Sequence, residues 1–215
     1  MTHALIIGAS GGIGAALARH LATDHDVTAL SRSGTGLDVT DEASVRDALA
    51  GLAPVDIAFV ATGILAPPGH SPEKSLEAVA AEALLRTFAV NAVGPALVLK
   101  HLASRLAPAA RVAVLTARVG SIGDNRMGGW YAYRASKAAA NQIVHGAAIE
   151  IGRRLKGSVV VALHPGTVET PFTEDYRAPK VAPGEAARNL VEVLKGLSPA
   201  DSGGFFDYAG ARVEW

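Results

Sequence analysis

The amino-acid sequence predicts an α/β fold, a single doubly wound domain built on a parallel sheet of six to seven strands. Short apolar runs, typical of buried strands, alternate along the chain with amphipathic stretches typical of helices. Such alternation predicts a parallel sheet with helices on both faces. The 215 residues suit one domain. The Pro- and Gly-rich clusters at 66–72 and 178–184 fit internal loops better than linkers, so we predict one domain over residues 1–215.

Six apolar runs predict the strands, and their lengths suit buried strands. They cover residues 4–7, 27–30, 55–60, 111–116, 158–163 and 204–208. Helical periodicity predicts helices over 13–21, 41–50, 72–90, 95–106, 133–155 and 184–194. Thr40 and Asp41 form a capping signature at the start of the second helix, and Gly51 ends it.

One connection is too short for this scheme. Only residues 33–37 separate the second strand from Asp38, whereas a parallel crossover needs a dozen residues or more. We therefore expect the usual crossover helix to be absent and the third strand of the sheet to be vestigial.

Composition excludes several classes of function. Lys and Arg number 20, as do Asp and Glu, so no net charge favours nucleic acid or an anionic membrane. The absence of Cys excludes thiolate metal sites, and the seven His residues are scattered singly, so we expect no metal. No apolar run approaches the ~18 residues of a membrane span. The N-terminus lacks the basic start of a signal peptide, so we expect a cytoplasmic protein.

The loop after the first predicted strand is rich in glycine. Residues 8–14 read GASGGIG, with Gly8, Gly12 and Gly14 set between a strand and a helix. Glycine lets backbone N–H groups approach an anion, and the helix N-terminus adds partial positive charge. The alternative is a tight turn that binds nothing. Because a strand precedes the loop and a helix follows it, we predict a Rossmann-type dinucleotide site that includes Ser10 and Ile13.

The end of the second predicted strand carries an arginine where NAD-binding folds place an acid. The sequence there is Ser31-Arg32-Ser33, without a carboxylate for the ribose hydroxyls. The guanidinium of Arg32 suits a 2′-phosphate. The alternative is a solvated surface arginine. The pattern favours NADP(H) over NAD(H).

Tyr133 and Lys137 lie four residues apart in a predicted helix, which places them on one face. A free phenol has a pKa of about 10, and a nearby ammonium group lowers that pKa. Such a pair can give a proton to a carbonyl oxygen or take one from an alcohol. Alone, the spacing is common and also fits a partly exposed helix face.

Taken together, these motifs resemble the short-chain dehydrogenase/reductase family over nearly the whole chain. The matching pieces are residues 8–14, Asp38 with Val39, Asn91, Tyr133 with Lys137, and the stretch 165–170, PGTVET. Residues 120–125, 128–134 and 204–208 look more narrowly like the C-factor-like and sniffer-like carbonyl reductases.

The resemblance implies roles for these residues. Tyr133 would be the general acid/base, Lys137 would hold the nicotinamide ribose, and Asn91 would anchor a water in the proton relay. Asp38 and Val39 would contact the adenine. The other implied cofactor contacts are Gly63, Pro165, Gly166, Val168 and Thr170. A homodimer or homotetramer is also implied. The alternatives are a helix-bending Asn91, a turn-capping Asp38, and ordinary turn chemistry at Val168 and Thr170.

The sequence departs from the family where a catalytic serine is usual. In the register of the Ser-x-x-Gly motif, Ala117 takes its place. Ser121 lies about the expected distance before Tyr133, and we include it among the catalytic candidates, while Thr116 is the adjacent alternative. Ala61 and Thr62 depart from the family's Asn-Asn-Ala-Gly in the same way. His164 is a candidate for the cleft wall, and residues 172–180 have the position of the family's substrate lid.

Two functions remain open. The first is an NADP(H)-dependent oxidoreductase that moves a hydride between nicotinamide and a small carbonyl or alcohol substrate, with Tyr133 exchanging the proton. The second is a dinucleotide-binding regulatory or signalling protein with little or no turnover. Ala117 and Ala61 motivate the second function, whereas Tyr133, Lys137 and Asn91 argue for the first.

Overall fold

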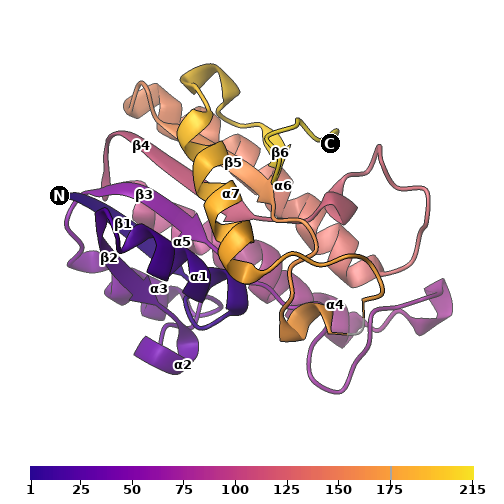
Figure 1. The fold of residues 1–215 in the computed structure, drawn as a ribbon. Helices are drawn as coiled ribbons and strands as arrows, with labels where there is room; N and C mark the ends of the chain where they lie inside the picture. Colours follow the sequence, from indigo (N-terminus) through magenta and orange to yellow (C-terminus); the bar gives the residue numbers. More distant parts are fainter. Residues whose placement is uncertain (175) are drawn as a thin grey trace.

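A computed structural model describes residues 1–174 and 176–215 and confirms the predicted α/β architecture. Its sheet has six strands in the order β2-β1-β3-β4-β5-β6, all paired in parallel (Figure 1). The strands are β1 Thr2–Ile7, β2 His25–Leu30, β3 Val55–Val60, β4 Leu106–Leu115, β5 Val159–His164 and β6 Phe205–Asp207. Each matches a predicted run, although β4 begins five residues early.

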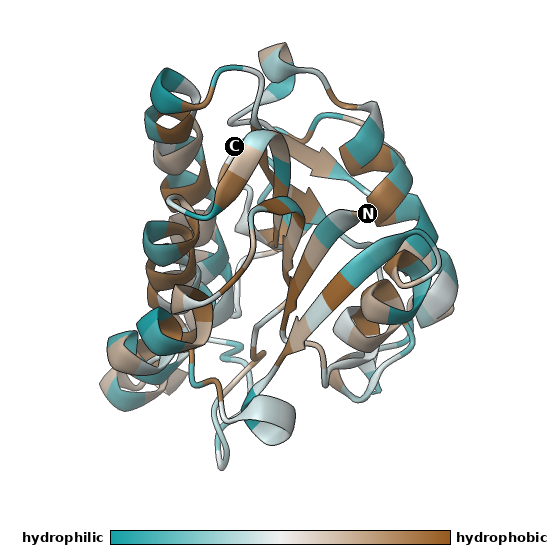
Figure 2. Cartoon of the chain, turned by 90° about the vertical axis from the view of Figure 1, so that its left-hand side faces the viewer, coloured by the Kyte–Doolittle hydropathy of each residue, from teal (hydrophilic) through white to brown (hydrophobic). Residues whose placement is uncertain are grey.

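The helices cover both faces of this sheet, as Figures 1 and 2 show. They are α1 Gly12–Leu21, α2 Arg32–Thr35, α3 Glu42–Ala50, α4 Ala81–Phe88, α5 Gly94–Leu102, α6 Tyr131–Arg154 and α7 Pro183–Gly196. Short turns of helix are η1 Leu76–Ala78, η2 Ala89–Val93, η3 Arg118–Gly120, η4 Pro171–Thr173 and η5 Pro199–Asp201. Side chains of α3, α5 and α6 join the core on one face, and those of α1 and α7 join the core on the other.

The strand residues alternate between these two cores. On β1, Leu5 and Ile7 face one core while Ala4 and Ile6 face the other, and all four are fully buried. A strand buried on both faces reads as a continuous apolar run, which is why the sequence revealed it.

The vestigial third strand is not formed among the described residues. The chain after β2 instead makes the single turn α2, in which the Ser31 hydroxyl accepts the N–H of Gly34 at 3.1 Å. Gly36, with φ of 78°, ends the turn in the left-handed conformation. The sheet therefore ends at β2.

The predicted helix over 72–90 is wrong in its first half. The chain reaches α4 only at Ala81, after the short turn η1. Glu73 is buried, its carbonyl oxygen accepts the N–H of Trp130, and its carboxylate accepts the N–H of Ala132 at 3.2 Å. These two hydrogen bonds connect the segment to the start of α6, a long-range contact that helical periodicity does not reveal.

The predicted helix over 95–106 continues from α4 through the π-helical turn η2 and stops at Leu102. The whole stretch Ala81–Leu102 is long and apolar enough to cross a membrane by length and composition alone, so our expectation of no such run is wrong. In this fold Val98, Leu99 and Leu102 belong to the core, which is the ordinary reason for an apolar helix in a packed domain.

Candidate active site

A cavity of about 850 Å³ lies at the carboxyl ends of the strands, where ligands bind in open α/β sheets. Its wall is formed by the loop after β1, the ends of β3, β4 and β5, the start of α6 and the segment that follows β5. The predicted residues that line it are Ser10, Gly12, Ile13, Gly14, Gly63, Tyr133, Lys137, Pro165, Gly166, Val168 and Thr170.

The glycine loop is shaped by close backbone approaches. Gly8 has φ of +89°, and a Cβ on Gly14 would lie 2.2 Å from the Gly8 oxygen. No side chain caps α1, and within the described ranges the N–H groups of Gly12 and Ile13 have no hydrogen-bond acceptor. Free N–H groups at a helix N-terminus fit the pyrophosphate of a dinucleotide. The loop therefore passes a structural test for such a cofactor.

Six predicted residues do not form part of the cavity wall: Gly8, Arg32, Asp38, Val39, Asn91 and Ser121. Arg32 is exposed at the start of α2. Asp38 accepts hydrogen bonds from the hydroxyl and N–H of Thr40, which lower the pKa of that carboxyl below its ordinary value. Its turn-capping alternative is thus realised.

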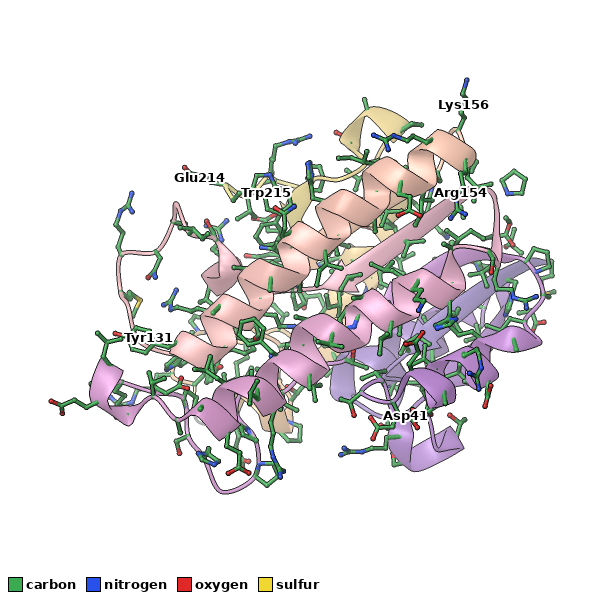
Figure 3. All side chains as sticks on the ribbon, turned by 180° about the vertical axis from the view of Figure 1, so that it is seen from behind. Asp41, Tyr131, Arg154, Lys156, Glu214 and Trp215 are labelled. Carbon is green, nitrogen blue, oxygen red and sulfur yellow. The ribbon has the colours of Figure 1, made fainter. Side chains whose placement is uncertain are left out.

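Tyr133 and Lys137 both reach the cavity from α6, whose first residue, Tyr131, is labelled in Figure 3. The Lys137 Nζ lies 5.8 Å from the centre of the Tyr133 ring and donates to the Leu115 oxygen at 3.0 Å. Burial lowers the pKa of Lys137 to about 8. Burial also raises the pKa of Tyr133, with a smaller contribution from Tyr176. The expected lowering of the phenol pKa by Lys137 is therefore not seen, because burial of the phenol raises that pKa.

Asn91 is fully buried in the π-helical turn η2. Its Oδ1 accepts the N–H of Ile64, and its Nδ2 donates to the Ile64 oxygen, both at 2.8 Å. The same Nδ2 donates to the Ser136 hydroxyl at 3.0 Å. Asn91 thus joins η2, α6 and the chain after β3. A Cβ on Gly63 would lie 3.2 Å from the Lys137 Nζ and 3.4 Å from the Asn91 Oδ1, so Gly63 fills the narrow space between them.

Ser121 is not brought to the cavity wall. It is almost fully buried, and its hydroxyl accepts the N–H of Asp124 at 3.0 Å. Thr116 and Ala117 do line the cavity, and the buried Thr116 hydroxyl oxygen has no partner on the residues that the structure describes. The geometry thus fails to support Ser121 as a catalytic residue and favours its alternative, Thr116.

His164 lines the cavity, as the sequence suggested. Thr116 donates its N–H to the Leu163 oxygen. Thr116 therefore continues the pairing of β4 with β5, one residue beyond the pair of Leu115 and Leu163. The Nδ1 of His164 is also buried, and residues 1–174 and 176–215 offer it no partner. Burial, followed by the positive charge of Arg118, lowers the pKa of His164 to about 4, although Asp207 acts in the opposite direction. The imidazole of His164 is therefore neutral at pH 7, on the wall of the cavity that Thr116 also lines.

The cavity also contains residues that sequence reasoning did not single out, notably Arg118, Arg126, Met127 and Arg134. Basic side chains in a loop or helix usually indicate solvent exposure, so sequence gave no reason to place them here. The one available signal was that Arg134 directly follows Tyr133.

The loop that carries Arg126 and Met127 is held by the last residues of the sequence. The N–H of Gly123 donates to the Trp215 oxygen at 2.9 Å. The Trp215 ring stacks on Phe205 with centroids 5.8 Å apart and meets His145 of α6 edge-on. Figure 3 shows Glu214 and Trp215 beside α6. The described part of the predicted lid, residues 172–174 and 176–180, contributes Phe172, Thr173 and Tyr176 to the cavity, whereas residue 175 lies outside the described residues.

Comparison with known proteins identifies relatives of this chain. A family model described as Enoyl-(Acyl carrier protein) reductase matches residues 14–192. C-signal of Myxococcus xanthus is 43% identical over 135 residues, which cover 61% of this chain and 78% of that protein. The 1-hydroxy-2-glutathionyl-2-methyl-3-butene dehydrogenase of Rhodococcus sp. (strain AD45) is 31% identical over 234 aligned positions that span both chains completely.

Among solved structures, the carbonyl reductase Sniffer of D. melanogaster superimposes with a TM-score of 0.85 over all of both chains, at 23% identity. At this identity the likeness supports the shared fold.

Lys137 predicts how stability depends on pH. Since its pKa is near 8 in the folded chain and about 10.4 when unfolded, the unfolded chain binds more protons between these values. The free energy of unfolding should therefore rise by about 2 kcal/mol from pH 8 to pH 10. Above pH 10, the raised pKa of Tyr133 acts in the opposite direction.

Urea unfolding of the wild type and Lys137→Met across this pH range measures the effect. We expect the rise in the wild type and its loss in the variant. Parallel curves for the two proteins would show that the ammonium group is not desolvated.

Proposed function

The chain belongs to the short-chain dehydrogenase/reductase family, and on this basis we propose that it is an NADP(H)-dependent oxidoreductase acting on a small carbonyl or alcohol substrate. The observation that carries the proposal is that Tyr133 and Lys137 share one cavity with the free N–H groups of the glycine loop. A proton donor, a cation and an anion site are thereby combined. The bound nicotinamide would supply or accept the hydride.

The residues of this chain would handle the proton. In carbonyl reduction, Tyr133 donates the phenolic proton to the substrate oxygen. Burial raises the pKa of the Tyr133 phenol, so the group is protonated at neutral pH and has a proton to give. The nearby ammonium of Lys137 then stabilises the phenolate that remains. Asn91 keeps the chain after β3 in place beside Lys137 through its two bonds to Ile64.

Thr116 is our candidate for the group that holds the substrate oxygen. Its buried, unpartnered hydroxyl lines the same cavity as Tyr133. A hydroxyl that donates to the developing oxyanion stabilises the transition state more than the ground state. We therefore assign to Thr116 the role that Ala117 cannot perform.

The predicted preference for NADP(H) rests on Arg32. Its guanidinium is exposed immediately after β2, and no carboxylate occupies the positions on either side of it. An assembly of two or four copies remains part of the proposal on the family resemblance alone.

The alternative is a dinucleotide-binding signalling protein. The similarity to C-signal and the alanine at position 117 favour it. The two functions differ in whether the chain reduces a substrate with Tyr133 as the proton donor.

Replacing Tyr133 by Phe tests the proposal. With NADPH and a panel of aldehydes and ketones, we expect kcat/KM to fall by about 10²- to 10⁴-fold, because the general acid is lost. Tyr131→Phe, on the same helix but outside the cavity wall, should retain activity. Tight NADPH binding by the wild type with no turnover across the panel would support the signalling function instead.

Thr116 is tested by a pair of variants. Thr116→Val keeps the shape of the side chain but removes the hydroxyl, and we expect kcat to fall about 10- to 100-fold. Thr116→Ser keeps the hydroxyl and should remain within about threefold of the wild type. Equal losses in both variants would indicate a packing role for this side chain.

Arg32 is tested by cofactor binding. Loss of a charge-assisted hydrogen bond to the 2′-phosphate predicts that Arg32→Ala weakens NADPH binding by about 10- to 100-fold. NADH has no such phosphate, so its dissociation constant should change less than about threefold. Fluorescence titration measures both constants, with Arg46→Ala on α3 as an exposed control. Equal weakening of both cofactors would contradict the assignment.

A further inference from the structure

We infer that the substrate carries a carboxylate in addition to its reacting carbonyl or hydroxyl group, and that Arg134 binds this carboxylate. The inference rests on the proposed function, since it assigns the substrate class of the same cavity. It is carried by the charges of the cavity wall and by the unpartnered guanidinium nitrogen of Arg134.

The wall of the cavity has an excess of positive charge. Its ionisable side chains on the described residues are Arg118, Arg126, Arg134, Lys137 and Tyr133, with Asp124 as the single carboxylate and His164 as the single imidazole. His164 is uncharged at pH 7, because burial and Arg118 hold its pKa near 4. On the described part of the wall, four cations therefore face one anion.

Asp124, the single carboxylate on the described part of the wall, pairs with Arg118. The Arg118 Nη1 lies 3.8 Å from the Asp124 Oδ2, and its Nη2 lies 3.3 Å from the Oδ2 of the nearly buried Asp207. Arg118 is thus compensated from two sides. Arg126 and Arg134 have no carboxylate within 4.0 Å on the residues that the structure describes.

Arg134 is the better placed of these two arginines. It follows Tyr133 directly in α6, and its side chain is partly buried. The Nη1 donates to the Val119 oxygen at 3.3 Å, which fixes the guanidinium beside the loop after β4. Among the described residues, neither the buried Nε nor the Nη2 has a hydrogen-bond partner. A guanidinium binds a carboxylate through two parallel N–H groups, so Arg134 retains donors for one.

The rest of the wall suits the body of such a substrate. Phe172 packs against Tyr133 with ring centres 5.8 Å apart, and Trp130 packs against both Tyr133 and Tyr176. Met127, also on the wall, is largely exposed. An apolar or aromatic skeleton would contact these side chains, with its carbonyl near Tyr133 and its carboxylate near Arg134. Arg126, which donates to the Gly123 oxygen at 2.8 Å, adds positive charge along the same loop.

Two substrates of one skeleton test the inference. With NADPH, 4-formylbenzoate is compared with methyl 4-formylbenzoate, which lacks the charge. We expect the carboxylate to have at least a tenfold higher kcat/KM, through a lower KM, and the difference to shrink as salt is raised from 0.05 to 0.5 M. Arg134→Met should lower kcat/KM at least tenfold for the carboxylate and change it less than threefold for the ester.

Two further variants control for structural damage. Arg134→Lys keeps the charge but not the planar pair of donors, so it should retain part of the preference. Arg153→Met makes the same substitution on an exposed residue near the other end of α6 and should change neither substrate. Turnover of the ester as fast as the carboxylate, or an unchanged preference in Arg134→Met, overturns the inference while leaving the proposed oxidoreductase intact.

A binding measurement separates failure of the inference from failure of the proposed function. The full chain with NADPH is titrated with 4-methylbenzoate and with 4-methylbenzamide, and its tryptophan fluorescence is followed. NADPH does not reduce either ligand. We expect Arg134→Met to raise the Kd of the benzoate at least tenfold and to leave that of the benzamide unchanged. Equal effects on both ligands overturn the inference, whether or not the enzyme turns over.

Discussion

The functional end of this molecule depends on one buried ammonium group. Lys137 donates to the Leu115 oxygen at the end of β4 and lies beside Gly63 and Asn91, which follow β3 and α4. This hydrogen bond connects α6 to the carboxyl end of β4 and so positions Tyr133 on the wall of the cavity. The interaction is costly, because burial disfavours the charged form, and the pKa of Lys137 near 8 reflects that cost. The buried ammonium group thus positions α6 but lowers the stability of the folded chain.

The same edge holds several polar atoms that the chain itself leaves without partners. Thr62 follows β3, Thr116 follows β4 and His164 ends the neighbouring β5, and each contributes one buried atom without a partner among the described residues. Four other buried side-chain atoms, on His25, Thr87 and Asn141, also lack a partner among the described residues, whereas Asn91 is paired through its two bonds to Ile64. Unsatisfied atoms that gather along a cavity are suited to a polar ligand, which would recover the free energy lost when they were removed from water.

The glycine loop shows how close packing creates an anion site. Gly8, Gly12 and Gly14 let the loop approach the chain after β3, Thr170 and itself at distances where a Cβ would clash. The N-terminal amides of α1 consequently remain open toward the cavity instead of being capped by a side chain. The close packing of these glycines is thus also what leaves the amides free for an anion such as the phosphate of the proposed cofactor.

The sequence by itself determined the alternation of strands and helices, the glycine loop and the Tyr133–Lys137 pair, because period and spacing are local properties of a chain. It could not show that Glu73 connects residues 72–80 to α6, because the hydrogen bond between Glu73 and Ala132 joins residues 59 positions apart in the sequence. Nor could it choose between Thr116 and Ser121, because strand pairing decides which hydroxyl reaches the cavity. It also missed Arg134, and it assigned to Tyr133 a pKa change opposite to the one that burial causes. Burial and charge compensation arise only when distant segments pack together, and only the tertiary structure could supply them.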